Sequence, residues 1–309
     1  MAQGSGMIPT ILLTGFLGVG KTTLLNRLIE HFKSRRTVLL INEFGQVGID
    51  GELLIEGNYE KIELNKGSLF CICVRTDFIA EVEKIAKKIQ PELLIIEATG
   101  LADTSEMEKM LALPNLKDHV QLRTCVCLVD CQTFLKIKDN LRAPTAQIRS
   151  ADLVLVNKID LVDHDRVNQI ISAIKHISAK VPIIPTAFAE FPLELFDSLH
   201  HPEIDMAEIP GDGRPDPVIS ITLEKMGNFT HQSWNEFKSL VLPELMRLKG
   251  FISLEGKSYY VDATMDRWSM TQWTKIKDRT NRLVLIGRNL DEEQIQERFF
   301  RTVVPEETY

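Results

Sequence analysis

The chain has 309 residues, a formal net charge of −7, 44% hydrophobic and 26% charged residues. This length is sufficient for two domains. The acidic balance argues against non-specific binding to nucleic acid or to an anionic membrane, and no apolar run approaches the about 20 residues of a membrane span. Five cysteines, an odd number, do not resemble a disulfide framework. Together these features favour a cytoplasmic protein.

Residues 1–7 contain neither a basic segment nor an apolar core. We therefore expect a disordered start or a cloning remnant rather than a signal peptide. Strand-like runs then alternate with helical patterns. Strands are predicted at 8–13, 37–42, 92–96, 124–129, 153–157 and 182–185, and helices at 21–33, 76–89, 103–111, 131–138 and 163–176. This alternation predicts an α/β domain over residues 8–202, a mostly parallel sheet with helices on both faces.

The most informative segment is GFLGVGKT at residues 15–22, between the first predicted strand and the first predicted helix. It is a complete G-x-x-x-x-G-K-T phosphate loop in the strand–loop–helix context that this motif requires. In such a loop, backbone N–H groups surround the nucleotide phosphates, the lysine reaches the outer phosphates and the last hydroxyl binds Mg²⁺. The residues predicted to do this are Gly15, Gly18, Val19, Gly20, Lys21, Thr22 and Thr23.

Residues 42–51, NEFGQVGIDG, follow the second predicted strand and are rich in glycine and acids. A nucleotide-sensing switch belongs at this place in a phosphate-loop domain. Asp50 and Glu43 are candidates for binding Mg²⁺ or for ordering the attacking water, and Gln46 is a third candidate. For each of them, a solvated loop residue is an equally good interpretation.

The predicted strand at 92–96 is followed by Glu97 and, three residues later, by Gly100. An acid at the end of a buried strand beside the phosphate loop can bind Mg²⁺ through water. We therefore predict that Glu97 completes the metal shell begun by Thr22, the alternative being a carboxylate that merely ends a strand. Gly100 is expected to let the backbone approach the terminal phosphate.

Residues 157–160, NKID, come directly after another apolar run. The Asp160 carboxylate can accept hydrogen bonds from N1–H and the exocyclic amine of guanine, which adenine does not offer, so it predicts selectivity for GTP and GDP. The Lys158 stem can lie over the base, and Asn157 is expected to hold the loop together. Thr186 and Ala187, after the last predicted strand of this domain, are weaker candidates for a base contact.

Two groups of residues, one of cysteines and one of histidines, are of types that bind metals, but each is explained without a metal. Cys125 and Cys127 alternate in a predicted strand and so share a face, and with Cys131 they are predicted to fill the core. His200 and His201 lie near a segment rich in proline and glycine, residues 203–217, which predicts an interdomain linker. Both histidines are predicted to be solvated loop residues.

Beyond the linker the pattern changes, with strands predicted at 218–223, 247–254, 258–261 and 282–286 and helices at 232–242 and 291–300. Strands bunched between two helices predict a smaller α+β domain over residues 218–309. It contains no catalytic constellation. Its tryptophans, Trp234, Trp268 and Trp273, are predicted to pack or to contact a client protein.

Taken together, these segments resemble the CobW-type GTPases, relatives of the hydrogenase- and urease-maturation GTPases. The resemblance covers roughly residues 8–190 and 217–300, and the matching pieces are TGFLGVGKTTLLN, INEFGQVGID, ELNKG, IIEATGLAD, VNKIDL, MRLKGF and NRLVLIGR. It implies a P-loop NTPase fold followed by a CobW-type C-terminal domain that recognises a client. It also implies a Mg²⁺-dependent GTPase that hands over a metal or prepares a metal or corrinoid centre.

The metal motif departs from the family pattern. The family has C-x-C-C after a stretch like ELNNG, whereas here ELNKG is followed by SLFCIC, so that Ser68 and Phe70 replace two cysteines and only Cys71 aligns. One thiolate cannot close a tetrahedral Zn²⁺ site. Cys71 and Cys73, completed by Glu43, a histidine or a second subunit, form the candidate site for Zn²⁺ or Co²⁺. Small switch-region thiols are the alternative.

Three functions therefore stay open: a metallochaperone GTPase, a GTPase that activates a metal- or corrinoid-dependent client without carrying metal, and a GTP-binding regulatory module with negligible hydrolysis. In the first two, water attacks the γ-phosphate in line, and Lys21, Mg²⁺ and backbone N–H groups stabilise the charge. No arginine finger is evident, Arg75 being the nearest candidate, so slow turnover without the client is expected. A homodimer is an open alternative to a monomer.

Overall fold

The structure is a computed structural model that describes residues 6–42, 54–64, 72–202, 218–265, 267–274 and 280–304. The chain divides into two compact units, which among these residues comprise 6–202 and 218–304. The predictions for Glu43, Gln46, Asp50, Cys71 and the linker lie outside the described residues. Within the described ranges, no helix combines the length and the apolar composition needed to cross a bilayer.

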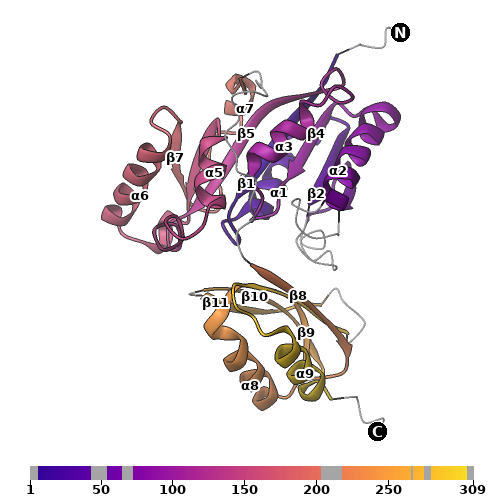
Figure 1. Ribbon diagram of the computed structural model, residues 1–309, viewed down its shortest axis with the longest axis vertical. Helices are drawn as coiled ribbons and strands as arrows, with labels where there is room; N and C mark the ends of the chain where they lie inside the picture. Colours follow the sequence, from indigo (N-terminus) through magenta and orange to yellow (C-terminus); the bar gives the residue numbers. More distant parts are fainter. Residues whose placement is uncertain are drawn as a thin grey trace. The chain divides into compact units, whose positions relative to one another are not determined.

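The first unit is built on a seven-stranded sheet whose neighbouring strands are all parallel, in the order β3-β2-β4-β1-β5-β6-β7 (Figure 1). Its central strands are runs of buried apolar residues, as expected for strands covered on both faces. The strands are β1 (Ile8–Gly15), β2 (Thr37–Asn42), β3 (Tyr59–Leu64), β4 (Leu93–Glu97), β5 (Val120–Asp130), β6 (Leu153–Asn157) and β7 (Ile183–Thr186).

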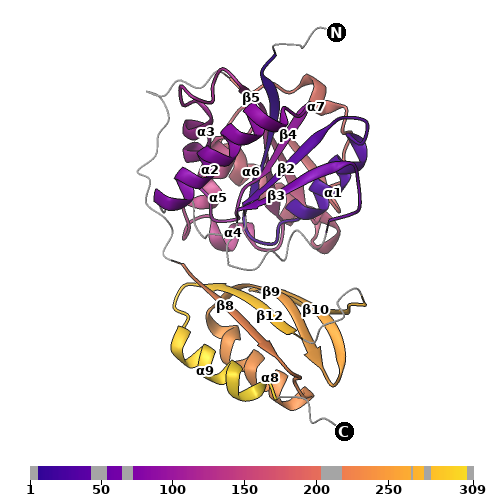
Figure 2. The same ribbon diagram turned by 90° about the vertical axis from the view of Figure 1, so that its right-hand side faces the viewer.

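Helices cover both faces of this sheet, with α2 and α3 on the opposite side from α1 (Figure 2). Phe78 of α2 and Met107 of α3 belong to one buried cluster with Leu12 and Leu94 of the sheet. The helical elements are α1 (Lys21–His31), α2 (Ile72–Lys84), its π-helical continuation η2 (Ile85–Ile89), α3 (Thr104–Leu111), α4 (Phe134–Ile137), α5 (Ala143–Arg149), η3 (Ile159–Leu161), α6 (His164–Ile177) and α7 (Leu195–Ser198). The predicted α/β architecture is confirmed.

Besides the single turn η3, three described elements of this unit are absent from the sequence prediction. Strand β3 lies at the edge of the sheet and carries Glu60, Lys61 and Glu63 in six residues, so it contains no apolar run. Helices α5 and α7 have only seven and four residues. Hydrophobic periodicity needs a window of about 11–18 residues to reveal a helix, so both fall below its reach.

The second unit has a five-stranded antiparallel sheet in the order β11-β10-β9-β12-β8, with α8 and α9 side by side on one face (Figure 1). Its elements are β8 (Ile219–Met226), α8 (His231–Val241), η4 (Leu242–Glu244), β9 (Leu245–Leu254), β10 (Lys257–Thr264), β11 (Arg267–Gln272), β12 (Thr280–Gly287) and α9 (Glu292–Thr302). The α+β prediction is confirmed, although β11 was not predicted.

Aromatic rings fill the core between this sheet and its helices. Phe229 makes ring contacts with Trp234, Phe237 and Phe299, with centroids 5.2 to 6.0 Å apart. Trp268 packs edge-on against Trp234 at 6.1 Å. Rings at these separations and tilts add favourable contacts to the area that they bury. The packing role predicted for Trp234 and Trp268 is therefore confirmed.

Candidate nucleotide site

The phosphate loop joins the end of β1 to the start of α1, and three of its glycines have positive φ: Gly15 at 132°, Gly18 at 74° and Gly20 at 110°. A Cβ atom at Gly15 would lie 2.4 Å from the backbone oxygen of Leu128. At Gly20 it would lie 2.5 Å from Nδ2 of Asn157. Glycine is therefore needed at both positions for conformation and for space.

The Lys21 side chain is buried inside the curve of this loop. Its Nζ donates hydrogen bonds to the backbone oxygens of Gly15 at 2.9 Å and of Phe16 at 3.1 Å. Thr22 is half-buried and Thr23 is exposed at the start of α1. The ammonium group and the helix N-terminus thus concentrate positive charge where the outer phosphates bind in this motif.

Three buried polar side chains lie at the carboxyl edge of the sheet: Asn42 ends β2, Glu97 ends the neighbouring β4, and Thr99 follows it. Burial raises the pKa of the Glu97 carboxyl, and the nearby Lys21 ammonium acts against that rise. Among the described residues, no hydrogen-bond partner is present for Oε2 of Glu97, for Oγ1 of Thr99 or for either amide atom of Asn42.

Leaving such atoms unpaired in a folded protein costs about 1–3 kcal/mol for each group, so they call for a ligand or ordered water. A buried carboxylate oxygen beside the phosphate loop fits Mg²⁺, which prefers carboxylate, hydroxyl and water oxygens. Thr22 and Glu97 are the residues that would hold the ion. The donor set that is present therefore suits the metal that the motif implies.

Asn157, at the end of β6, connects three segments. Its Nδ2 donates to the backbone oxygen of Val19 at 2.8 Å, and its Oδ1 accepts from the backbone N–H of Ala189 at 2.9 Å. Lys158 has a left-handed backbone with φ 65°, and its Nζ donates to the backbone oxygen of Gly18 at 2.7 Å. Asp160 follows in η3 with its side chain exposed to solvent. The NKID loop is thus fastened to the phosphate loop, with its aspartate accessible.

Asp130 completes this connection, and sequence reasoning missed it. It lies buried at the end of β5, where Oδ2 pairs with the Lys158 ammonium and Oδ1 accepts from the backbone N–H of Gln132 at 2.7 Å. The signal that could have found it is the one that singled out Glu97, an acid at the end of a buried apolar strand. No motif contains it, because its partner Lys158 lies 28 residues away.

Gly100 lies against the phosphate loop. A Cβ atom there would come within 2.7 Å of the backbone nitrogen of Leu17, so glycine permits this approach. Gln147 of α5 holds the segment by donating from Nε2 to the backbone oxygens of Gly100 and Ala102, both at 3.2 Å. Gln147 was also missed, since a lone glutamine in a short helix carries no recognisable pattern.

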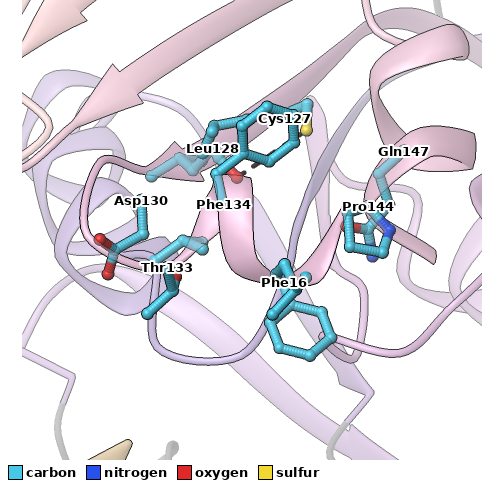
Figure 3. A pocket seen from close by; sticks show the side chains of 11 residues that line it. Phe16, Cys127, Leu128, Asp130, Thr133, Phe134, Pro144 and Gln147 are labelled. Atoms are coloured by element: carbon cyan, nitrogen blue, oxygen red, sulfur yellow. Dashed lines mark hydrogen bonds between the residues drawn. The ribbon is translucent and has the colours of Figure 1, made fainter. Parts of the chain in front are cut away.

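Behind the phosphate loop, side chains of Phe16, β5, α4 and α5 enclose a small cavity (Figure 3). Phe16, Phe134 and Pro144 are among its apolar lining residues, while Thr133 and Asp130 lie at one end. Its volume of about 10 Å³ accommodates about one water molecule and no nucleotide. The cavity is therefore too small to be the nucleotide site, and the side chains around it pack behind the phosphate loop.

Three of the cysteines in the described part of the chain lie in the core. Cys125, Cys127 and Cys131 are free and buried, which confirms that they fill the core. Burial raises the pKa of Cys127 to about 12 and that of Cys131 to about 11, so both are protonated thiols near neutral pH. Within the described ranges, no group of three or more histidines, cysteines and acids could hold a metal ion. The side chain of Cys73, in α2, is outside the description.

The prediction for His201 is wrong, whereas His200 is exposed as predicted. The His201 side chain is only 6% exposed; its Nδ1 lies 2.9 Å from Oδ2 of Asp152 and its Nε2 3.9 Å from Oε1 of Glu108. Burial alone would lower the pKa of His201, but the hydrogen bond to Asp152 and the two negative charges raise it. Burial raises the pKa of Glu108 to about 7. These partners come from distant segments, which is why the sequence did not indicate them.

Arg75, the candidate arginine finger, forms an ion pair with Glu106 of α3. Glu106 also accepts a hydrogen bond from Lys109 at 3.1 Å. The guanidinium group of Arg75 is thus paired with a carboxylate between α2 and α3.

A parallel sheet with a phosphate loop after β1 and an NKxD loop after β6 defines a P-loop protein of the GTPase class. The model of the CobW/HypB/UreG nucleotide-binding domain matches residues 9–185, more than half of the chain, and that of the cobalamin synthesis protein cobW C-terminal domain matches residues 218–303. The protein belongs to the CobW/HypB/UreG family of P-loop GTPases.

Several known proteins are similar over long stretches. Zinc-regulated GTPase metalloprotein activator 1 of Dictyostelium discoideum is 31% identical over 62% of this chain, which spans about half (48%) of that protein's length. Zinc chaperone CobW of Pseudomonas aeruginosa is 27% identical over 93% of this chain and 89% of its own. The Zn(II)-bound YjiA GTPase from E. coli is 19% identical, with a TM-score of 0.47, over 97% of this chain and 100% of that one.

Proposed function

We propose that this protein is a Mg²⁺-dependent GTPase that acts as a metallochaperone or in the maturation of a client metalloenzyme. The observation that carries the proposal is the direct connection between the two nucleotide motifs. Asn157 donates to Val19 at 2.8 Å and Lys158 donates to Gly18 at 2.7 Å. A loop that binds phosphates and a loop that reads guanine are thereby held in one site.

In the proposed reaction, the phosphates of GTP bind to the N–H groups of residues 15–22, and Asp160 accepts the hydrogen bonds of the guanine edge. Lys21 and the N-terminus of α1 stabilise the charge that develops as water attacks the γ-phosphate. Mg²⁺, held by Thr22 and Glu97, supplies further neutralisation of phosphate charge when bound. Asp50 and Glu43 are the candidates for ordering the attacking water, and we expect turnover to be slow without the client.

The test measures phosphate release and nucleotide competition. Lys21→Ala is expected to lower the rate of GTP hydrolysis about 100-fold or more, because it removes a preorganised cation from the transition state. The control is Lys33→Ala, an exposed lysine paired with Glu30 just after the same helix. GTP should displace a bound guanine nucleotide far better than ATP, and Asp160→Asn should remove that preference.

Two outcomes would contradict parts of this proposal. Phosphate release that is unchanged in Lys21→Ala, with or without a client, would leave only a regulatory GTP-binding module. Competition by ATP as strong as that by GTP would remove the role assigned to Asp160.

A second candidate, a GTPase that activates a metal- or corrinoid-dependent client without carrying metal, is favoured by Ser68 and Phe70 at the family's cysteine positions. What supports the metallochaperone is that two relatives are named as zinc-linked proteins. The Cys71→Ser/Cys73→Ser variant separates the two. A metallochaperone would lose stoichiometric, GTP-dependent binding of Zn²⁺ or Co²⁺, whereas a metal-free activator would keep its full effect on the client.

We assign recognition of the client to the second unit and place the protein in the cytoplasm, where a client metalloenzyme or corrinoid protein would be met. A homodimer could complete a site at Cys71 and Cys73. Size-exclusion chromatography with light scattering, with and without Zn²⁺ and GTP, tests that assembly.

A further inference from the structure

Phe188 stands out on the surface of the first unit, since 69% of this aromatic residue is exposed. It lies in the segment after β7, and its φ of 53° is followed by the same φ at Ala189. Two successive non-glycine residues in the left-handed region are unfavourable, and such strain persists only where the surroundings enforce it. Strained positions of this kind are concentrated at ligand-binding sites.

The segment is held firmly in this conformation. Ala189 is fully buried, and its N–H donates to Oδ1 of Asn157 at 2.9 Å. The Thr186 hydroxyl donates to the backbone oxygen of Glu190 at 2.5 Å, and the N–H of Glu190 donates to the backbone oxygen of Ala187 at 3.0 Å. The exposure of the neighbouring ring is therefore imposed by an ordered turn.

This turn emerges beside the NKID loop. Asn157 and Thr186 are paired in the parallel register of β6 and β7, so both loops leave the same edge of the sheet as neighbours. The same Asn157 side chain binds Ala189 on one loop and Val19 on the phosphate loop. An exposed ring is thus placed next to the loop whose aspartate is proposed to read guanine.

We propose that Phe188 is a stacking residue for the purine base of the bound nucleotide; this rests on the proposed function. Asp160 satisfies the edge of the base and the Lys158 stem can lie over one of its faces, while the other face remains to be covered. An aromatic ring covers that face without distinguishing one purine from another, since every base has a π-face. Phe188 therefore contributes to affinity, and selectivity for guanine remains with Asp160.

The experiment measures GDP binding by calorimetry in Phe188→Ala, Phe188→Leu and Phe188→Trp. Phe188→Ala is expected to weaken GDP binding about ten-fold, within the range measured for base–aromatic stacking, with Phe188→Leu in between. Phe188→Trp should keep the affinity and show a change of tryptophan fluorescence on GDP binding. Met226→Ala, which removes an equally exposed apolar side chain from the second unit, is the control.

Inorganic tripolyphosphate, which has no base, separates stacking from a general effect on the site. Its competition with GDP should give the same affinity for tripolyphosphate in Phe188→Ala as in the wild type. An equal loss for tripolyphosphate, or unchanged GDP affinity in both Phe188→Ala and Phe188→Leu, would overturn the assignment of stacking. If instead Asp160→Asn also left GDP affinity unchanged, the guanine site itself would be refuted.

Discussion

The two units treat a buried asparagine in opposite ways. Asn281, in the second unit, is 0% exposed; its Nδ2 donates to the backbone oxygens of Lys225 at 3.0 Å and Gly227 at 2.9 Å, and its Oδ1 accepts from the N–H of Ser253 at 2.8 Å. Asn42, in the first unit, is 2% exposed, and neither of its amide atoms has a partner within the described residues.

The difference is between a buried polar side chain that pairs with groups of the fold and one that has no such pair. Asn281 connects β12 to β8 and β9, so its amide replaces water for groups that the fold itself buries. Asn42 lies with Glu97 and Thr99 at the carboxyl edge of a parallel sheet, which is where ligands bind in open α/β folds. The unpaired atoms of Asn42, Glu97 and Thr99 therefore lie together where a ligand could bind them.

The largest expected effect would break this comparison directly. Asn281→Ala should lower the free energy of unfolding of the second unit by about 2–4 kcal/mol, because it leaves buried backbone groups unpaired. Asn42→Ala should change the stability of the first unit by less than about 1 kcal/mol, since no hydrogen bond of the described structure is lost. Urea unfolding of both variants measures this. Equal losses would contradict the distinction.

A somewhat smaller effect is expected at Glu97. Glu97→Gln should raise the Mg²⁺ concentration needed for half-maximal GTP hydrolysis by about 10- to 100-fold, because a carboxylate that would hold the ion is replaced by a neutral amide. Titration of phosphate release with Mg²⁺ measures it. Glu60→Gln, at an exposed position of the edge strand β3, is the matched control. An unchanged Mg²⁺ requirement would show that Glu97 only ends a strand.

Glu108 extends the comparison of buried polar groups to a carboxyl of the first unit that lies away from the proposed nucleotide site. Its folded pKa of about 7 exceeds the ordinary 4.5, so between these values the folded state binds more protons than the unfolded state. Stability should therefore fall as pH rises from about 4.5 to above 7, by about 3 kcal/mol. The raised pKa of His201 acts in the same direction, its contribution being lost as pH rises above 6.5.

Glu108→Gln should flatten this dependence and leave only the slope that His201 contributes. Urea unfolding at about pH 5 and pH 8 measures the difference, with Glu60→Gln again as the control. An unaltered slope in Glu108→Gln would mean that Glu108 is already ionised in the folded protein.

The smallest effect is expected at Arg75. Its pair with Glu106 is partly exposed, with 41% of the arginine side chain accessible. Arg75→Ala should therefore lower stability by less than about 1 kcal/mol. GTP hydrolysis without a client should change by less than about three-fold, because the guanidinium group is paired with Glu106. Removing a cation that stabilises the transition state would instead cost about 100-fold or more. A loss of that larger size would identify Arg75 as an arginine finger.

Much of the first unit could be predicted because its signals are local. Apolar runs marked six of the seven strands, and the spacing of Gly15, Gly20, Lys21 and Thr22 marked the loop between β1 and α1. Charged β3 and short α5 were missed because neither offers enough consecutive pattern. In the second unit, β11 was missed for a similar reason, since RWSMTQ has no apolar run.

The sequence by itself determined the fold class and the family, because both rest on residue spacing within short segments. Only the tertiary structure decided which distant residues meet: Asp130 with Lys158, Gln147 with Gly100, and Asp152 with His201. It also decided that Phe188 is exposed on an ordered turn while the adjacent Ala189 is buried. The physical reason is that burial and pairing depend on strand order, and a parallel sheet brings together strand ends that are far apart in the chain.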